Sequence, residues 1–510
     1  MNLFGTKKAI CEIPDIGFGK IIFSEAEGEE CSVVSVEEVT EKCFDVYLQS
    51  VKNIGYKDSS KQCMNENRFY VLVKDNTTLY ISYYPTVQQM RVVGEGGTAY
   101  PDFKDTAMGA NVQPLLTHID LIGYGLSYVI RLSDGRFIIF DGGWEKFEKD
   151  IDKLMQVMRE QSPYTTPRIA AWIFTHPHVD HYRCFLGFYP KYKDSVEIER
   201  LIYNFPNFEE KFEERYPDQI SWKEDVHVKR FEALVKESKI PVLRAHTGQV
   251  YNISDARLEV LSTTDDTLLY PMEDTNALSL MIKVYIAGQS ILFCADGDFR
   301  KALFVERYGN YLKSDILQIP HHGFCGGTAE GYRAIYPDVC LLPCEATLFY
   351  SDIYMADNDT LIYDLDVKEI LTGQYGNHVL PLPYTAKPNG RHIMFERLNE
   401  VQNSMGSKIW YFEDMTWDEC KFNVLNTTFW DIDVSAVLYF EDKADRITGI
   451  KMTANGNCIT KIDFNNLKDI GMSTNPFEEK GIDKSKKFTV RFKSKSSVVI
   501  SCGKPPVYVG

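Results

Sequence analysis

Apolar and polar residues follow three different patterns along this chain, and the pattern changes twice. In the N-terminal part, apolar residues recur at helical spacing after Ser35, with Glu38 completing a capping box and Gly55 where a helix would stop. The segment RFYVLVKDNTTLYISYY then alternates as two strands around a turn. We therefore expect residues 1–110 to form a small α+β domain that ends in a glycine-rich linker.

In the middle of the chain, short apolar strands end in Gly and Asp clusters and alternate with helical stretches. This alternation is typical of a layered α/β architecture and extends over residues 111–400. Beyond it, regularly spaced short strands with turn signals predict a β-rich domain over residues 401–510. A chain of 510 residues is long enough for about three such domains and for at least one large core.

The composition is that of an ordinary folded protein, with 44% hydrophobic residues and a net charge of −16 from 56 Lys and Arg against 72 Asp and Glu. Nonspecific nucleic-acid binders usually gather Lys and Arg on one face, so the acidic balance disfavours that class. The 12 cysteines are scattered without a C-x-x-C pair, which fits a reducing compartment. The chain shows no apolar signal segment and no run of about 18 apolar residues, so we expect a cytoplasmic protein without a membrane span. The sequence leaves the oligomeric state open.

The strongest chemical signal is the segment AAWIFTHPHVDHYRCF, in which an apolar strand runs directly into His176, His178, Asp180 and His181. Imidazole nitrogens and a carboxylate suit borderline divalent ions, and a loop that leaves a strand end can fold several of them around one point. The alternative is a polar surface turn, but histidines this dense are costly unless something binds them. The segment therefore predicts a metal site.

Three further strand ends carry polar residues that suit such a site. Asp141 begins the cluster DGG, where it can fix the tautomer of a ligating imidazole or form a plain turn. Asp296 follows the strand SILFC, where a carboxylate can bridge two cations or form an Asx turn. The strand in SDILQIPHHG ends in His321 and His322, of which one would ligate and the other would act on the substrate, unless both face solvent. The sequence does not decide between them, and our working assignment makes His321 the ligand and His322 the catalytic residue.

With these four pieces in this order, the stretch Leu115 to Arg397 resembles the metallo-β-lactamase-fold hydrolases. The family signature H-x-H-x-D-H is present as HPHVDH, its Asp-x-Gly strand tip as DGG, and its bridging-aspartate strand as ILFCAD. Within the superfamily the stretch looks most like the branch that ends in P-H-H-G, which includes the hydrolase domain of competence-type DNA-uptake proteins and related cell-wall phosphodiesterases. That branch also has an Asn and a Ser before the hairpin, matching Asn276 and Ser279.

The resemblance implies an α/β (α+β) fold, a four-layer αββα sandwich with its metals on loops along one edge of the sheets. It implies two Zn²⁺ ions, with Mn²⁺ or Fe as alternatives for a carboxylate-rich site. Asp180 would also orient the attacking water, which makes it a catalytic residue as well as a ligand. Carried onto this chain, one metal is held by His176 and His178, the other by Asp180, His181 and one of His321 or His322, with Asp296 bridging and Asp141 supporting a ligand from behind.

The chain departs from the family pattern after the first motif and in the bridging motif. Tyr182, Arg183 and Cys184 stand where the family often has two glycines, so the entrance is more crowded and carries a guanidinium that could attract an anionic substrate. Ala295 stands where the bridging motif usually has glycine.

The central histidine of many family members has no clean equivalent here. Asp265 lies nearest to the expected place, and His246 resembles that histidine but precedes the strand where it is expected, so a structural role suits it better. His378 could reach the cleft, although a surface position is the alternative. The third ligand of the first metal, and with it a mononuclear site, stays open.

These features predict a hydrolase that uses a metal-activated water on a phosphodiester or another ester, in a small-molecule or oligomeric substrate. The alternative from another class is a noncatalytic binding or scaffold protein that retains the fold. A nonspecific nuclease would bind DNA in a salt-sensitive way, which the net charge of −16 disfavours.

Overall fold

The computed structural model describes most of the chain and divides it into two compact units. The first unit comprises Met1–Cys344 with Leu371–Thr385, and the second comprises Glu345–Ile370 with Ala386–Gly510. The expected domain boundary near residue 400 lies outside the described residues. Of the linker expected from Gly94 to Phe103, residues 97–102 also lie outside them, whereas residues 94–96 and 103 belong to strands. No helix among the described residues combines the length and the apolar character needed to cross a bilayer. The described residues are 2–3, 12–27, 31–96, 103–105, 109–122, 125–208, 211–272, 274–343, 357–358, 360–361, 365, 367–373, 376–387, 401–402, 407–426, 432–440, 446–455, 459–470, 472, 474–479, 482–495 and 498–502.

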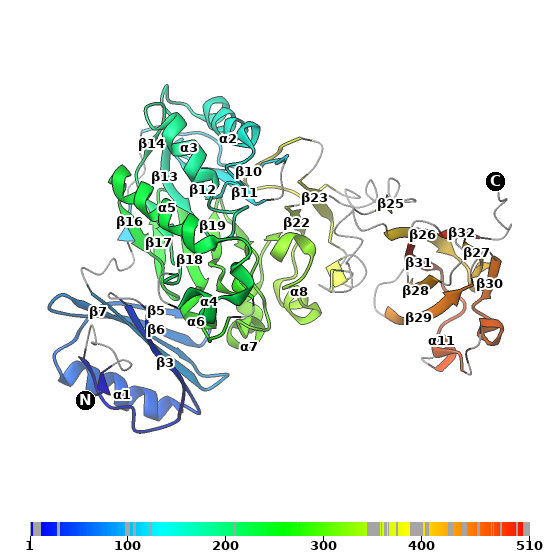
Figure 1. Cartoon of the computed structure of the whole chain (residues 1–510), viewed down its shortest axis with the longest axis horizontal. Helices are drawn as coiled ribbons and strands as arrows, with labels where there is room; N and C mark the ends of the chain where they lie inside the picture. The colour runs from blue at the N-terminus through cyan, green and yellow to red at the C-terminus, as the bar shows by residue number, and fades with distance from the viewer. Residues whose placement is uncertain are drawn as a thin grey trace. The chain divides into compact units, whose positions relative to one another are not determined.

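The first unit begins with an antiparallel sheet of order β3-β4-β8-β7-β6-β5 and one helix, α1 (Figure 1). Phe44, Leu48 and Val51 of α1 pack on the buried side chains of Leu72 and Val92 from the sheet. The expected strand pair around a turn is confirmed as β6 and β7. The bounds are β1 Asn2–Leu3, β2 Glu12–Ile13, β3 Lys20–Glu27, β4 Cys31–Glu37, α1 Glu41–Asn53, β5 Lys57–Met64, β6 Asn67–Lys74, β7 Thr77–Tyr84 and β8 Gln89–Gly96.

The expected helix start at Ser35 is wrong, because β4 continues to Glu37 and α1 begins at Glu41. Val36 is fully buried in the sheet, so the apolar residue that resembled the first turn of a helix face belongs to a strand. Thr40 caps the helix instead, and its hydroxyl accepts a hydrogen bond from the backbone N–H of Cys43 at 3.3 Å.

Two mixed eight-stranded sheets form the middle of the first unit. Phe140 of β12 stacks on Phe293 of β20 with ring centroids 4.0 Å apart, which joins the two sheets face to face. The first sheet has the order β16-β15-β13-β12-β11-β10-β24, with β14 paired to β13, and the bounds β10 Leu115–His118, β11 Ser127–Arg131, β12 Phe137–Asp141, β13 Arg168–Ile173, β14 Glu197–Ile198, β15 Leu201–Tyr203, β16 Val242–Arg244 and β24 His378–Pro381. The second has the order β23-β22-β21-β20-β19-β18-β17-β9 and the bounds β9 Phe103–Lys104, β17 Val250–Ile253, β18 Ala256–Ser262, β19 Met281–Ile286, β20 Gln289–Phe293, β21 Ile316–Gln318, β22 Val339–Leu342 and β23 Glu369–Thr372.

Helices α2, α3 and α5 cover the outer face of the first sheet (Figure 1). Trp172 of β13 is fully buried beneath them and contacts Phe185 and Phe188 of α3 edge-on, at centroid distances of 5.5 and 5.0 Å. This is the αββα sandwich that was expected. The helices are α2 Glu148–Gln161, α3 Cys184–Tyr192, α4 Phe212–Arg215, η1 Pro217–Gln219, α5 Glu224–Ser238, α6 Thr264–Thr267, η2 Thr275–Leu278, α7 Phe304–Tyr308, η3 Gly309–Leu312, η4 Pro320–Gly323 and α8 Ala329–Ile335.

A buried ionic cluster joins the N-terminal sheet to the sandwich. Asp266 of α6 forms ion pairs with Arg91 of β8 and with Arg307 of α7, the latter at 2.9 Å. Tyr84 of β7 donates a hydrogen bond to the same carboxylate at 2.8 Å. Removing one partner of such a buried pair leaves an uncompensated charge, which costs about 3–5 kcal/mol, so the sheet and the sandwich fold against each other.

A second polar cluster at this junction contains His246, which lies fully buried between two carboxylates. Its Nδ1 donates to Asp265 at 2.7 Å and its Nε2 lies 3.2 Å from Glu95. The imidazole stacks on Tyr80 of β7, with ring centroids 3.8 Å apart. Although burial opposes it, Glu95 and Asp265 raise the pKa of His246 to about 9.

The second unit contains two small antiparallel sheets, of order β25-β26-β31-β28-β29 and β30-β27-β32. Phe422 of β27 packs on Phe464 and on Phe492 of β31, with ring centroids 5.5 and 4.7 Å apart, so the two sheets share one core. The bounds are β25 Val401–Gln402, β26 Ser407–Met415, η6 Trp417–Glu419, β27 Lys421–Asn426, β28 Ile432–Phe440, β29 Arg446–Ala454, β30 Ile459–Asp463, η7 Leu467–Ile470, α11 Pro476–Glu479, β31 Phe488–Lys495 and β32 Val498–Cys502.

The raised pKa of His246 predicts a pH-dependent contribution to stability. The folded pKa of about 9 lies above the value near 6.5 of an unfolded histidine, so the stabilisation is complete below pH 6.5 and is lost as the pH rises through about 9. We expect the difference in free energy of unfolding between the wild type and His246→Gln to shrink over this range by an amount on the order of 3 kcal/mol. Urea unfolding at a series of pH values measures it, and a difference that stays constant contradicts the ion pairs described here.

Candidate metal centre

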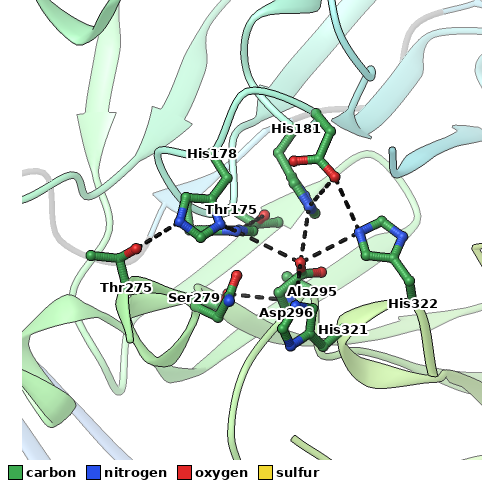
Figure 2. Close-up of polar contacts among 12 residues, drawn as sticks. Thr175, His178, His181, Thr275, Ser279, Ala295, Asp296, His321 and His322 are labelled. Carbon is green, nitrogen blue, oxygen red and sulfur yellow. Dashed lines mark hydrogen bonds and ion pairs between the residues drawn. The ribbon is translucent and has the colours of Figure 1, made fainter. Parts of the chain in front are cut away.

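The segment after β13 brings its polar side chains together within one turn of chain. The backbone N–H of His178 donates to the carbonyl of His176 at 3.0 Å, and that of His181 donates to the carbonyl of His178 at 3.1 Å. This tight path places Nε2 of His176 3.0 Å from Nδ1 of His178. The two nitrogens are the ring atoms free to face a common ligand. Figure 2 shows His181 and His322 directed toward Asp296.

Asp296 lies at the centre of the cluster, at the end of β20. Its backbone N–H donates to the hydroxyl of Ser279 at 3.3 Å. The preceding residue, Ala295, has a φ of 49°, a left-handed conformation that glycine adopts without strain. The side-chain oxygen of Gln318 accepts from the backbone N–H groups of Cys294 and Ala295 at 2.8 and 2.6 Å, which holds this conformation in place.

His321 and His322 take different positions although they are neighbours in the chain. Nε2 of His322 lies 3.3 Å from Asp180 and 3.4 Å from Asp296, while its Nδ1 donates to the carbonyl of Pro343 at 3.0 Å. His321 is 22% exposed, its Nε2 is 3.8 Å from Asp296, and its Nδ1 is 2.7 Å from Sγ of Cys325. The geometry therefore reverses the working assignment: His322 takes the ligand position and His321 faces the substrate side.

The side chains form two groups of three, and within each group the candidate ligand atoms all lie within 4.8 Å of one another. Two buried atoms in these groups, Nε2 of His181 and Oδ1 of Asp296, have no hydrogen-bond partner in the described part of the chain. Imidazole nitrogens and carboxylate oxygens that converge on one point without hydrogen-bond partners suit a divalent cation. The third member of the first group is Asp296, the position that the sequence left open. The groups are His176, His178 and Asp296, and Asp180, His181 and His322.

The charges of the two groups differ. Burial lowers the pKa of His176 well below its ordinary value, so this imidazole is neutral. For His181 and His322 burial is outweighed by the carboxylates of Asp296 and Asp180, which raise the pKa of His181 well above its ordinary value and that of His322 to about 10. Without a metal, protons on these imidazoles compensate the carboxylates. Cation binding is therefore expected to release protons.

Asp141 supports the cluster from beneath and does not enter it. Its carboxylate accepts from Nδ1 of His181 at 2.8 Å and from the hydroxyl and backbone N–H of Thr175 at 2.6 and 2.8 Å. The bond to Nδ1 leaves Nε2 of His181 directed at the cluster. Gly142, which follows Asp141, is packed too closely for a side chain, because a Cβ there would lie 2.9 Å from Cβ of Cys184.

Two supporting residues carried no recognisable signal in the sequence. The hydroxyl of Thr275, at the start of η2, lies 2.6 Å from Nε2 of His178 and donates to Asp218 of η1 at 3.1 Å. Nδ1 of His178 faces the cluster, and the hydrogen bonds from Nε2 through Thr275 to Asp218 fix the imidazole in the way that Asp141 fixes His181. Thr275 is 97 residues from His178 in the chain, so only the nearby Asn276 and Ser279 hinted that this loop reaches the site.

The remaining predicted residues lie elsewhere. Arg183 is bound to Glu145, with its Nε 2.8 Å from one carboxylate oxygen, and its guanidinium lies over the ring of Trp144. Asp265 and His246 pair with each other at the junction with the N-terminal sheet. Nε2 of His378 lies 2.8 Å from the carbonyl of Thr372, and the histidine is part of β24. None of the four predicted residues lines the cavity beside the metal groups.

A cavity of about 520 Å³ opens next to the metal groups. Polar and aromatic side chains share its wall, and two members of the second group, Asp180 and His322, reach it. Its lining residues are Trp144, His178, Val179, Asp180, Asp218, Gln219, Trp222, Glu224, Asn276, Asp296, His321, His322 and Phe324.

Residues 121–329 match the family model of the metallo-β-lactamase superfamily, and the αββα sandwich described above has the fold of that superfamily. Among solved structures, the chain is similar to CmlA, a diiron β-hydroxylase from Streptomyces venezuelae, with 12% identity, a TM-score of 0.33 and coverage of 53% of this chain and 54% of that one. It thus spans about half the length of CmlA.

Two other solved structures are similar to parts of the chain. A protein from Parabacteroides distasonis described as a metal-dependent hydrolase has 14% identity and a TM-score of 0.27, over 58% of this chain and 93% of that one. The Anabaena sensory rhodopsin transducer has 20% identity and a TM-score of 0.15, over 19% of this chain and 92% of that one. At these values none of the structures indicates a reaction or a ligand for this chain. No curated protein sequence matches it.

The hydrogen bond between Asp141 and His181 predicts a loss of metal affinity on its removal. Asp141→Asn keeps the shape of the side chain but weakens the acceptor for Nδ1, and we expect Zn²⁺ affinity to fall by about 10–100-fold. Competition with a chromogenic chelator measures the affinity. His378→Asn, in β24, is the matched control and is expected to bind Zn²⁺ like the wild type; equal affinity in both variants contradicts the supporting role of Asp141.

Proposed function

We propose that this protein is a metal-dependent hydrolase that cleaves a phosphodiester or another ester with water, in the manner of the P-H-H-G branch it resembles. The observation that carries the proposal is the position of Oδ2 of Asp296, which lies 3.3 Å from Nε2 of His181 and 3.4 Å from Nε2 of His322 at the wall of the cavity. A carboxylate so placed between two ligand groups suits a bridging role.

The chain supplies ligands for two ions. His176, His178 and Asp296 would hold one ion, and Asp180, His181 and His322 would hold the other. Ligands of this type favour Zn²⁺, and the carboxylates also suit Mn²⁺ or Fe. When bound, such ions lower the pKa of water toward neutrality and polarise the group under attack.

The residues around the ions position the reactants. The side chain of Asp180 is 23% exposed and lines the cavity, so its carboxylate can accept a hydrogen bond from the attacking water and orient it. His321, on the same wall, presents Nε2 as a hydrogen-bond donor to a substrate oxygen that gains negative charge. Ser279 and Gln318 hold the loop that carries Asp296 and so keep its carboxylate in place.

Turnover of small esters by the metal-loaded protein tests the proposal. We expect hydrolysis of bis-p-nitrophenyl phosphate after reconstitution with Zn²⁺ or Mn²⁺, loss of activity on chelation and recovery when the metal returns. Asp296→Asn removes the shared carboxylate charge and is expected to lower kcat by a factor of about 10²–10³ or more. His378→Asn serves as the control and keeps full activity. A phosphomonoester, a lactone and a lactam in the same assay define the reaction class.

The outcome separates an enzyme from a scaffold. Binding of less than about half an equivalent of metal per chain after reconstitution, together with no turnover of any substrate, supports the noncatalytic binding protein instead. If the lactam alone is turned over, the protein is a hydrolase but the proposed ester substrate is wrong.

A further inference from the structure

One part of the cavity wall comes from a segment without any candidate metal ligand. Asp218 and Gln219 belong to η1, Trp222 follows them, and Glu224 begins α5. Trp222 is 57% exposed although it is a large aromatic residue. Apart from the support that Asp218 gives to His178 through Thr275, the side chains of this wall face the cavity without a described role at the metal groups.

Four hydrogen-bond acceptors among the residues that line the cavity are unsatisfied, three in this wall and one in η2. Each is buried and has no hydrogen-bond partner among the residues that the structure describes. The side chains of Glu224 and Gln219 belong to residues that are 0% and 3% exposed. A buried acceptor without a partner is unfavourable by about 1–3 kcal/mol, so a ligand with N–H or O–H donors would remove this cost. The four atoms are Oδ1 of Asp218, Oε1 of Gln219, Oε1 of Glu224 and Oδ1 of Asn276.

Two of these acceptors belong to carboxyl groups, those of Asp218 and Glu224. Asp218 receives its hydrogen bonds from Thr275 and Gln219, and Glu224 receives one from the hydroxyl of Tyr182 at 2.9 Å. The described residues that line the cavity include no Lys or Arg. The nearby Arg183 is already bound to Glu145. An anionic polymer is therefore a poor fit, whereas a cation would find two carboxylates.

Aromatic rings complete the wall. Trp144, Trp222 and Phe324 line the same cavity. The face of an aromatic ring attracts an organic cation, with the strongest attraction to tryptophan. Carboxylates that need donors and rings that favour cations thus occur in one wall.

We propose that the ester cleaved at this site carries a protonated amine, whose N–H groups bind Glu224 and Asp218 among the aromatic rings while the ester group lies at the metal ligands. The inference rests on the proposed hydrolase function and specifies its substrate class. Burial raises the pKa of Glu224 to about 8, and a bound ammonium favours the ionised carboxylate, so each charge stabilises the other.

Binding of simple probes tests the wall without turnover. Propylammonium and 1-propanol have the same size and differ in charge, and their binding to the full-length protein can be followed by tryptophan fluorescence. We expect propylammonium to bind at least about tenfold more tightly than 1-propanol. Glu224→Gln removes the charge but keeps the shape and is expected to abolish most of this preference. Asp225→Asn, which removes the neighbouring carboxylate outside the cavity, is the matched control and is expected to keep it.

A second, exposed position keeps the test independent of folding. Trp222→Ala changes a side chain that is 57% exposed and should leave the melting temperature unchanged while weakening propylammonium binding about threefold to fivefold. If Glu224→Gln does not fold, the preference for propylammonium over 1-propanol is measured with Asp218→Asn and Trp222→Ala instead. Equal binding of propylammonium and 1-propanol, or a preference for a neutral polyol such as glycerol, overturns the inference.

Kinetics on a matched pair of diesters separates this inference from the proposed function. We expect p-nitrophenyl 2-aminoethyl phosphate to be hydrolysed with a kcat/KM at least about tenfold above that of p-nitrophenyl propyl phosphate, and Glu224→Gln to bring the ratio near one. Cleavage of both diesters at equal rates overturns the amine preference and leaves the hydrolase standing. If neither diester is cleaved but propylammonium still binds more tightly than 1-propanol, the hydrolase proposal is overturned and the cation-binding role of the wall is supported.

Discussion

One carboxylate oxygen, Oδ2 of Asp296, lies within 4 Å of four imidazole nitrogens, and the architecture of the sandwich serves this convergence. Strands from both sheets end around it, and the chain accepts unfavourable backbone conformations to place the side chains. The φ angles of Asp141, Ala295, His321 and His322 are all positive, between 46° and 51°. The four distances to Oδ2 are 3.9 Å from His176, 3.3 Å from His181, 3.8 Å from His321 and 3.4 Å from His322.

The sequence predicted those parts of the fold and site whose signals are local. The motif HPHVDH can be recognised because its six residues are consecutive in the sequence. Asp296 can be recognised because it follows β20 closely. The order of His321 and His322 was not predictable, because two successive left-handed residues decide which ring turns inward. Thr275 was missed for a different reason: its contact with His178 spans 97 residues and depends on the packing of two short 3-10 helices.

The cavity divides the chemistry between two kinds of chain segment. Loops that follow strand ends carry the candidate metal ligands, whereas η1 and the beginning of α5 form another part of the cavity wall. A site of this design keeps its reaction centre fixed while the helical segment sets which substrates bind. The net charge of −16 and the carboxylates of Asp218 and Glu224 act in the same direction, since both repel a polyanion and attract a cation.

The buried pairing of Asp266 with Arg91 and Arg307 has a consequence for the history of the chain. Arg91 belongs to the N-terminal sheet, whereas Asp266 and its second partner, Arg307, belong to the sandwich. A sandwich transferred by recombination into another polypeptide without this sheet would lose the Arg91 partner of Asp266 and the hydrogen bond from Tyr84, and would expose the remaining pair of Asp266 and Arg307. Its descendants would have to inherit the sheet together with the sandwich, or exchange Asp266 and Arg307 for apolar residues at once, so the two parts are expected to evolve as one inherited block.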